Sequence, residues 1–289
     1  MNEAARVLLI SPQGMLGRAW RALLAERGTP VDTVDLPSFD LTDRASVERA
    51  VGSEHAWVVN CSGWTDVDGA EAKEAQATAV NGVGVGWLAE RCRLTGSRLV
   101  HYSTDYVFSG VASAPYRTDE PHAPLNAYGR SKALGESLIL QSGVPHLLVR
   151  TSWLYAPWGN NFVRTIARLS RERAELKVVN DQRGRPTSAE RLAEATFALM
   201  EQGAETPGVD GIFHIADEGE CTWFELARAI VAASNPSCSV RPCTTAEFPR
   251  PARRPSYSVL DLTKSARRLG AARPWQESLI DVMGRLEPT

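Results

Sequence analysis

The chain has 289 residues, which corresponds to about two domains at roughly 150 residues each. Hydrophobic residues make up 43% and charged residues 23%, which excludes a disordered chain, a collagen-like repeat and a small disulfide-rich scaffold. The net charge of −2, from 32 basic and 34 acidic residues, gives no global signal for binding of nucleic acid or of an anionic membrane surface.

The N-terminal region and the cysteines predict a cytoplasmic protein. The first apolar run, at 7–11, is shorter than a signal-peptide core, and no stretch approaches the roughly 20 apolar residues of a membrane span. The five cysteines are odd in number, scattered, and without the spacing of a zinc site. We therefore expect reduced thiols in a reducing compartment.

Strand and helix patterns alternate through the first half of the chain. Apolar runs typical of buried parallel strands lie at 7–10, 31–35, 56–60, 98–104 and 146–152. Helical spacing of apolar residues covers 14–27, about 70–94 and 126–141. This alternation predicts an α/β fold of the Rossmann-like kind, a doubly wound parallel sheet with helices on both faces.

The pattern loosens after residue 153. We expect helices at 161–173, 188–200 and 222–234, and short strands at 176–180 and 211–216. Residues 235–258 are rich in Pro, Ser and Arg, so we predict a long ordered loop there rather than a core element. Loops of that length in a compact protein are often functional.

The segment after the first strand is a candidate dinucleotide turn. Gly14 and Gly17 occupy the second and third positions of the expected three-glycine turn, and Ser11 occupies the first. Backbone N–H groups of such a turn can reach a pyrophosphate at the helix N-terminus, although Pro12 lacks this group. An ordinary strand-to-helix turn would give the same short pattern.

A carboxylate at the end of the second strand is a candidate contact for the adenosine ribose. Asp35 stands at that position, where it would favour NADH over NADPH because it would repel a 2′-phosphate. Asp40 and Leu41 are further candidates at the adenine end. Either acid could instead be a solvated loop residue.

Tyr128 and Lys132 form a Y-x-x-x-K motif on a predicted helix. The spacing of four puts the phenol and the ammonium on one helix face. We expect the ammonium to stabilise the phenolate and to bring its pKa from about 10 toward the working pH. Thr104 ends the fourth strand, at the edge where a doubly wound sheet binds its ligands, and could donate to a substrate carbonyl oxygen.

Together these features resemble the extended short-chain dehydrogenase/reductases, and further motifs narrow the resemblance to the dTDP-4-dehydrorhamnose reductase family. Those motifs are Thr65-x-Val67-Asp68-x-Ala70-Glu71, 101–108, 124–129, 150–155, 159–162, 180–187, and Arg254-Pro255 with Ser258 and Leu260. They span roughly residues 7–285.

The resemblance implies reduction of the C4 ketone of dTDP-4-dehydro-6-deoxy-L-mannose to dTDP-L-rhamnose, with NADPH or NADH as cofactor. Thr104, Tyr128 and Lys132 would be the catalytic triad, with Tyr128 protonating the C4 oxygen. The implied cofactor contacts are Ser11, Gln13, Gly14, Met15, Leu16, Asp35, Asp40, Leu41, Cys61, Ser62, Gly63, Tyr128 and Lys132.

The implied substrate contacts are Val67, Thr104, Asp105, Tyr106, Tyr128, Trp153, Asn161 and Arg254. Trp153 would cover one face of the deoxyhexose, although a core aromatic is the alternative. Arg254 would bind the diphosphate bidentately, unless the basic loop at 241–254 is only solvated. Tyr106 stands where the related 4,6-dehydratases carry an acid, which argues against dehydration.

The expected organisation places 1–152, with 187–216 returning to them, in the dinucleotide-binding part. Residues 153–186 and 217–289 would form a smaller C-terminal α/β substrate lobe. The implied partner is a dTDP-sugar, and the resemblance allows a homodimer. Glu190 matches a Mg²⁺-binding position of some relatives, but the acidic set is incomplete, so we expect no metal.

Two other functions stay open at this point. One is a 4-ketoreductase that acts on a different nucleotide-linked keto-sugar, in the synthesis of a natural product or a polysaccharide. The other is a non-catalytic dinucleotide-binding subunit similar to the regulatory subunit of methionine adenosyltransferase. Ser11 at the first-glycine position favours this last alternative, whereas the complete triad favours an enzyme.

Overall fold

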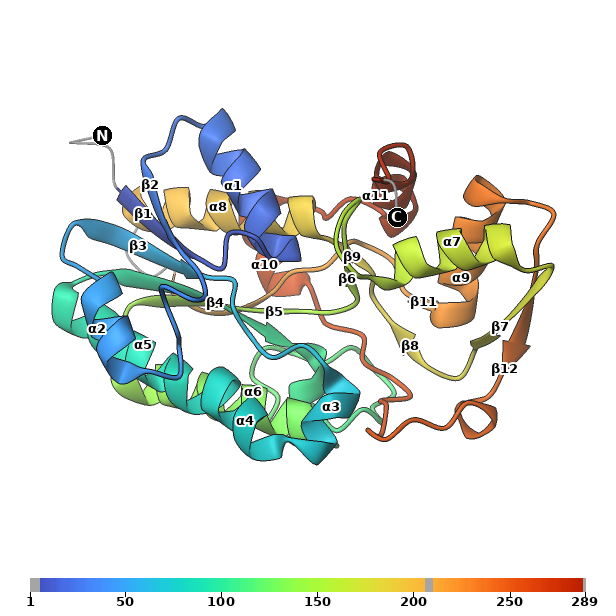
Figure 1. Ribbon diagram of the computed structural model, residues 1–289, viewed down its shortest axis with the longest axis horizontal. Helices are drawn as coiled ribbons and strands as arrows, with labels where there is room; N and C mark the ends of the chain where they lie inside the picture. The colour runs from blue at the N-terminus through green and yellow to red at the C-terminus, as the bar shows by residue number, and fades with distance from the viewer. Residues whose placement is uncertain (1–5, 206–209, 288–289) are drawn as a thin grey trace.

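The computed structural model describes residues 6–205 and 210–287 (Figure 1). The first five residues, which we included in the search for a signal peptide, lie outside these ranges. Within the described residues, no helix has the length and apolar character needed to cross a membrane.

A six-stranded parallel sheet forms the centre of the molecule, with strand order β10-β5-β4-β3-β1-β2. The strands are β1 (Arg6–Ile10), β2 (Val31–Val34), β3 (His55–Asn60), β4 (Arg98–Thr104), β5 (His146–Thr151) and β10 (Gly211–His214). The predicted doubly wound sheet is confirmed, and all six strands overlap the apolar runs expected from the sequence. The last strand, β10, pairs with β5 at one edge.

Helices cover both faces of this sheet, as Figure 1 shows. One face packs against α1 (Met15–Glu26) and α8 (Ala189–Glu205). The other packs against α2 (Arg44–Ala50), α5 (Gly84–Thr95) and α6 (Ala127–Ser142). Successive side chains of a strand point to opposite faces, so each buried strand supplies apolar residues to two cores.

The face of the sheet that packs against α6 becomes polar at the carboxyl ends of the strands. There the alternation places five buried polar side chains, which we call the polar seam: Asn60, His101, Ser103, Arg150 and His214. Each of them is at most 4% exposed. The opposite face carries apolar residues at the equivalent places, including Val59, Val100, Val149 and Phe213.

The expected helix over 70–94 is interrupted. The structure has α3 (Val67–Ala72), α4 (Glu74–Thr78), the π-helical turn η1 (Ala79–Val83) and then α5. Asp66 caps α3 by accepting a hydrogen bond from the Gly69 N–H, so the helical region begins earlier than expected. Lys73, with φ of −133°, separates α3 from α4.

A separate core belongs to a smaller lobe, seen beside the sheet in Figure 1. Its helices are α7 (Phe162–Glu172), α9 (Trp223–Ser234) and α11 (Trp275–Met283), which pack with the parallel pair β7 (Glu175–Val179) and β12 (Ser239–Cys243). The remaining elements are β6 (Leu154–Tyr155), β8 (Arg183–Gly184), β9 (Thr187–Ser188), β11 (Cys221–Thr222), α10 (Thr263–Leu269) and the 3-10 turns η2 (Asp105–Val107) and η3 (Thr245–Glu247).

The prediction of a loop over 235–258 is wrong, because β12 lies within it. Most side chains of β12 are exposed, so no apolar alternation marks the strand in the sequence. Its proline, Pro242, is tolerated because a two-stranded sheet leaves one edge of each strand unpaired.

Candidate active site

The turn between β1 and α1 is built as a tight strand-to-helix turn. Ser11 has φ of 61°, in the left-handed region that favours glycine, although it is the residue that replaces the first glycine. A Cβ on Gly17 would lie 2.0 Å from the Ser11 carbonyl oxygen, so only glycine fits there. Gly14 has no such contact below 3.5 Å. The Gly14 cap leaves the start of α1 without a side-chain cap, which suits a helix end that receives a phosphate.

The structure brings Asp35 next to this turn. Its Oδ1 accepts a hydrogen bond from the Leu36 N–H at 3.0 Å and lies 3.4 Å from the donor Ser11 Oγ. Asp40 instead folds onto its own loop, where Oδ1 accepts from the N–H and the hydroxyl of Thr42. Leu41 is buried, with its carbonyl oxygen against the backbone of α5 at Gly84.

The segment after β3 runs beside the lysine of the predicted triad. The Cys61 N–H donates to the Ile10 carbonyl, and Ser62 donates from both its N–H and its hydroxyl to Asn60 Oδ1. A Cβ on Gly63 would lie 3.4 Å from Lys132 Nζ. Burial raises the pKa of the Cys61 thiol, so this side chain stays neutral.

The start of α6 is fixed against the turn η2, which brings Tyr128 to Thr104. Asn126 caps the helix by accepting from the Gly129 N–H, and a Cβ on Gly129 would lie 2.3 Å from the Tyr106 carbonyl oxygen. The rings of Tyr106 and Tyr128 meet edge to face at 5.6 Å. Thr104 is buried at the end of β4, and its hydroxyl lies near enough to the Tyr128 phenol to affect its pKa.

The electrostatics at Tyr128 differ from the expectation. Burial raises the pKa of the phenol above its ordinary value, while the nearby Thr104 hydroxyl opposes this rise. The lysine therefore does not bring the phenol to the working pH in this structure, and Tyr128 stays in the neutral state that a proton donor needs.

Two further groups near Tyr128 have shifted pKa values. Lys132 is 6% exposed, and its Nζ donates to the Tyr102 carbonyl at 2.8 Å. Burial lowers the pKa of Lys132 to about 8. Burial raises the pKa of Asp105 to about 6, although its Oδ1 accepts a hydrogen bond from Thr104 Oγ1 at 2.9 Å.

The aromatic residue expected to cover the sugar belongs to a cluster in the smaller lobe. Trp153 has φ of 48° and stacks on Trp223 with ring centroids 3.6 Å apart. A Cβ on Gly184 would lie 2.6 Å from the Trp153 ring, so the glycine allows this close packing. Asn161 has a structural role: it caps α7 through the Arg164 N–H, and its amide donates to two carbonyls of the preceding turn.

The predicted diphosphate contact is held beside α3. Arg254 Nη2 lies 3.0 Å from Asp68 Oδ2, and Arg250 binds the same carboxylate. The Ala252 N–H donates to Asp68 Oδ1 at 3.1 Å. Arg254 Nη1 is buried without a hydrogen-bond partner among the residues that the structure describes. Asp68, next to Val67, was noted in the sequence only as part of a motif, although it anchors the segment that carries both arginines.

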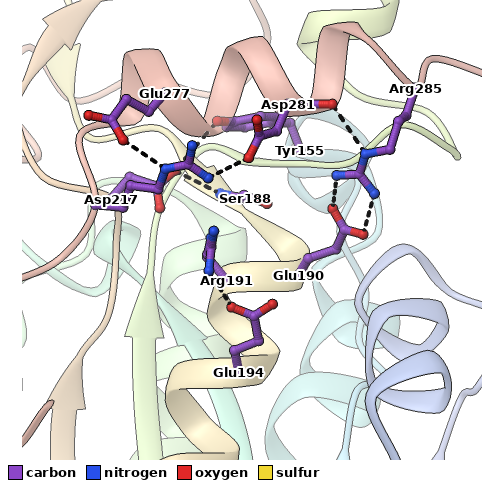
Figure 2. Close-up of polar contacts among 10 residues, drawn as sticks. Tyr155, Ser188, Glu190, Arg191, Glu194, Asp217, Glu277, Asp281 and Arg285 are labelled. Carbon is purple, nitrogen blue, oxygen red and sulfur yellow. Dashed lines mark hydrogen bonds and ion pairs between the residues drawn. The ribbon is translucent and has the colours of Figure 1, made fainter. Parts of the chain in front are cut away.

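Acidic residues around Glu190 are paired with arginines (Figure 2). Both oxygens of Glu190 accept from Arg285, at 2.8 and 2.6 Å. Glu194 pairs with Arg191, and Asp281 pairs with Arg273. Over residues 6–205 and 210–287, no three His, Cys, Asp or Glu side chains form a group that could hold a metal ion.

Comparisons with known proteins agree with the fold. The model of the family described as the RmlD substrate binding domain matches residues 5–287. A dTDP-4-dehydrorhamnose reductase from Streptomyces griseus is 41% identical over 283 residues, which is 96% of this chain and 92% of that protein. A dTDP-4-keto-6-deoxy-D-glucose reductase from Streptomyces niveus is 42% identical over 261 residues, 88% of each chain.

A solved structure extends this similarity to three dimensions. The crystal structure of a dTDP-4-dehydrorhamnose reductase from Bacillus anthracis in complex with NADP superimposes with a TM-score of 0.90 at 33% identity. The superposition covers 96% of this chain and 98% of that chain. The agreement therefore includes both the sheet and the smaller lobe.

Proposed function

Since this chain belongs to the RmlD substrate binding domain family, and matches reductases over most of its length, we propose that it reduces dTDP-4-dehydro-L-rhamnose at C4 to give dTDP-L-rhamnose. The reductant is NADPH or NADH. The observation that carries this function is the meeting of Thr104, Tyr128 and Lys132 at the carboxyl edge of the sheet, beside a glycine turn that fits a dinucleotide. The enzyme is then an oxidoreductase of the short-chain dehydrogenase/reductase type.

The turn after β1 and the segment after β3 fit the cofactor. The turn from Ser11 to Leu16 and the uncapped start of α1 would bind the pyrophosphate, because Gly17 lets the backbone close tightly there. Asp35 would bind the ribose hydroxyls at the adenosine end. Gly63 leaves room beside Lys132 Nζ, where the ammonium would bind the nicotinamide ribose. When it is bound, the reduced nicotinamide supplies a hydride.

Tyr128 supplies the proton in this reaction. Its phenol is neutral and lies near the Thr104 hydroxyl, so both hydroxyls could donate hydrogen bonds to the C4 oxygen. The single proton of Thr104 now points to Asp105 Oδ1, so donation to substrate requires the hydroxyl to rotate away from the carboxylate. Tyr128 then gives its proton to the oxygen as the negative charge develops there.

The smaller lobe would bind the nucleotide sugar. Asp105 contacts Thr104 and Tyr106 contacts Tyr128, and Val67 would bind the sugar beside them. Trp153 stacks on Trp223 in the smaller lobe, and its ring would cover the deoxyhexose. Arg254, which Asp68 holds through Nη2, would contact the diphosphate. We propose the domain boundaries on the same grounds, because β10 returns from the lobe to pair with β5.

Partner and location follow as proposals of the same kind. The dTDP-sugar is the one partner that the site chemistry supports directly. Pairing of two copies is consistent with the family resemblance, and the cytoplasm is the compartment that supplies both nucleotide substrates. Size measurement by light scattering at several protein concentrations tests the homodimer.

The test of the catalytic assignment is Tyr128→Phe. We expect turnover to fall by about 10²–10⁴-fold, because the general acid is lost, while cofactor affinity is retained. Oxidation of NADPH or NADH in the presence of the keto-sugar nucleotide is followed at the reduced nicotinamide band, and affinity is measured by fluorescence titration. Tyr155→Phe is the control, since Tyr155 is a buried tyrosine whose hydroxyl contacts Asp217 instead of the triad.

The outcomes also separate the alternative functions. Full activity of Tyr128→Phe would contradict the proton-donor role. The Streptomyces niveus relative favours a second candidate, in which dTDP-4-keto-6-deoxy-D-glucose is the preferred substrate. Both nucleotide sugars are therefore compared with both cofactors. Cofactor binding without oxidation in any combination would indicate a non-catalytic dinucleotide-binding subunit.

A further inference from the structure

A buried carboxylate lies one helical turn after the lysine of the triad. Glu136 on α6 is completely buried, and Arg150 of β5 binds it through three contacts: Nε to Oε1 and Oε2 at 3.0 and 3.1 Å, and Nη2 to Oε2 at 2.6 Å. The ring nitrogen of His122 lies 2.7 Å from Oε2. Burial alone would raise the pKa of Glu136, but the hydrogen bonds from His122 and Arg150 lower it to about 2. The carboxylate is therefore ionised at every working pH.

The arginine that holds this carboxylate is itself immobilised. Arg150 is 1% exposed, and its Nη1 donates to the Thr118 carbonyl at 3.1 Å. Its guanidinium lies 4.9 Å from the centre of the Phe108 ring. His214 of β10 adds a contact at 3.4 Å, and burial lowers the pKa of this histidine to about 3, so it adds no charge. Glu136 is thus held in one place by fixed groups from separate elements.

Lys132 faces Glu136 because residues four apart share a helix face. The titratable groups that interact electrostatically with its amine are Glu136 from α6 and His101 from β4. His101 stays neutral, since burial lowers its pKa well below the ordinary value and the lysine lowers it further. Burial lowers the pKa of Lys132, and Glu136 opposes that change. Glu136 is therefore the ionised acid in this group.

We propose that Glu136 is a positioning residue whose fixed negative charge keeps the Lys132 amine protonated in the working enzyme. This role rests on the proposed function, in which the ammonium binds the nicotinamide ribose and faces the triad. Arg150 and His122 hold the carboxylate ionised although it is buried, and α6 sets its distance from the lysine. The charge on the lysine then depends on Glu136 and the groups that hold it, and not on the Y-x-x-x-K motif alone.

The first test is the pH profile of turnover for Glu136→Gln, which removes the charge and keeps the size. Activity needs the ammonium, so it falls as pH rises through the pKa of Lys132. Loss of a neighbouring opposite charge moves this fall to lower pH by about one unit. At ~pH 9 the variant should therefore lose about tenfold more activity than it loses at ~pH 6.

Two controls separate charge from structure. Glu74→Gln removes an acid of α4 that pairs with Arg130 of α6, the helix that carries Lys132. This ion pair is exposed and water screens it, so the profile should not move. Glu136→Asp keeps the charge and should restore the profile of the original enzyme. An equal loss of activity at every pH in Glu136→Gln, with the fall at its original position, would overturn the proposal.

A second variant covers failure of Glu136→Gln to fold. Glu136→Gln combined with Arg150→Met removes both buried charges, so no unpaired cation is left in the core. It should show the same displaced profile as Glu136→Gln. A profile at the original position in this double variant would overturn the proposal.

A measurement without turnover keeps this inference separate from the proposed reaction. The pKa of Lys132 is about 8 in the folded protein and about 10.5 in an exposed lysine, so its contribution to stability increases as pH rises between these values. We expect Glu136→Gln to extend this window to lower pH by about one unit in thermal unfolding, and Lys132→Met to abolish the window in both backgrounds. An unchanged lower edge in Glu136→Gln would contradict the proposal even if no substrate were ever found.

Discussion

The two faces of the central sheet are built from the same strands but differ in chemistry. On the face that packs against α1 and α8 the side chains are apolar over most of each strand, as Val59, Val149 and Phe213 illustrate, and become polar at the last residues of β4 and β5, Thr104 and Thr151. Below α6 the apolar pattern stops before the carboxyl edge, where the polar seam begins. The comparison teaches that one face stabilises the fold mainly through apolar contacts. On the other face, buried polar and charged side chains replace part of the apolar core beside the reacting groups.

The largest expected loss of stability tests the polar face. Arg150→Met leaves Glu136 buried without its cation, which we expect to lower the free energy of unfolding by about 3–5 kcal/mol. Urea denaturation followed by far-UV circular dichroism measures this. Adding Glu136→Gln to the same chain should recover most of the loss, because replacing a whole buried ion pair is often nearly neutral. A single variant that loses less than about 1 kcal/mol would show that the two charges are not coupled.

A core substitution on the apolar face sharpens the comparison from the other side. Leu147 of β5 is completely buried below α1 and α8, so Leu147→Ala should lower the free energy of unfolding by about 2–4 kcal/mol, through lost contacts and a cavity. Turnover of the folded enzyme should keep its pH profile, because no charge changes. A shift of the pH profile of turnover would contradict the conclusion that this face affects stability and not the charges at the active site. The measurements are urea denaturation and initial rates at several pH values.

The smallest effect is expected at the turn between β1 and α1, at the carboxyl edge of the sheet. Ser11→Gly removes the cost of about 1–2 kcal/mol that a side chain has in the left-handed region. Glycine also makes the unfolded chain more flexible, which lowers the free energy of unfolding by about 0.5–1 kcal/mol. We therefore expect a gain of roughly 0.5 kcal/mol in thermal unfolding, and equal or tighter cofactor affinity in fluorescence titration. A large loss of affinity would show that the serine hydroxyl, which now faces Asp35, makes a specific contact.

The sheet was predictable from the sequence, because parallel strands buried on both faces appear as continuous apolar runs. The run at 98–104 coincides with β4, and the helix expected at 126–141 lies within one residue of α6 at each end. The positions of Thr104 and Tyr128 followed from the same patterns. Their proximity follows from Gly129, which lets α6 lie directly on η2.

Other features left no local pattern. The strand β12 is mostly exposed, and α2 is short and rich in charges, so neither carries an apolar period. The polar seam is assembled from separate strands, and Glu136 and Arg150 meet only when β5 packs below α6. Each of them alone is a charged residue in an apolar segment, and only the three-dimensional pairing identifies the partner.

The late position of β10 in the chain has a consequence for biosynthesis. When β5 has left the ribosome, its outer edge has no partner, and β10 begins only at Gly211. At about 5–20 residues per second, the nascent chain leaves the backbone N–H and C=O groups of this edge unpaired for several seconds. Unpaired strand edges recruit other chains, so this interval is when aggregation or chaperone capture takes place. We therefore expect messages truncated between the codons for β5 and β10 to yield insoluble product, as the insoluble fraction after expression would show.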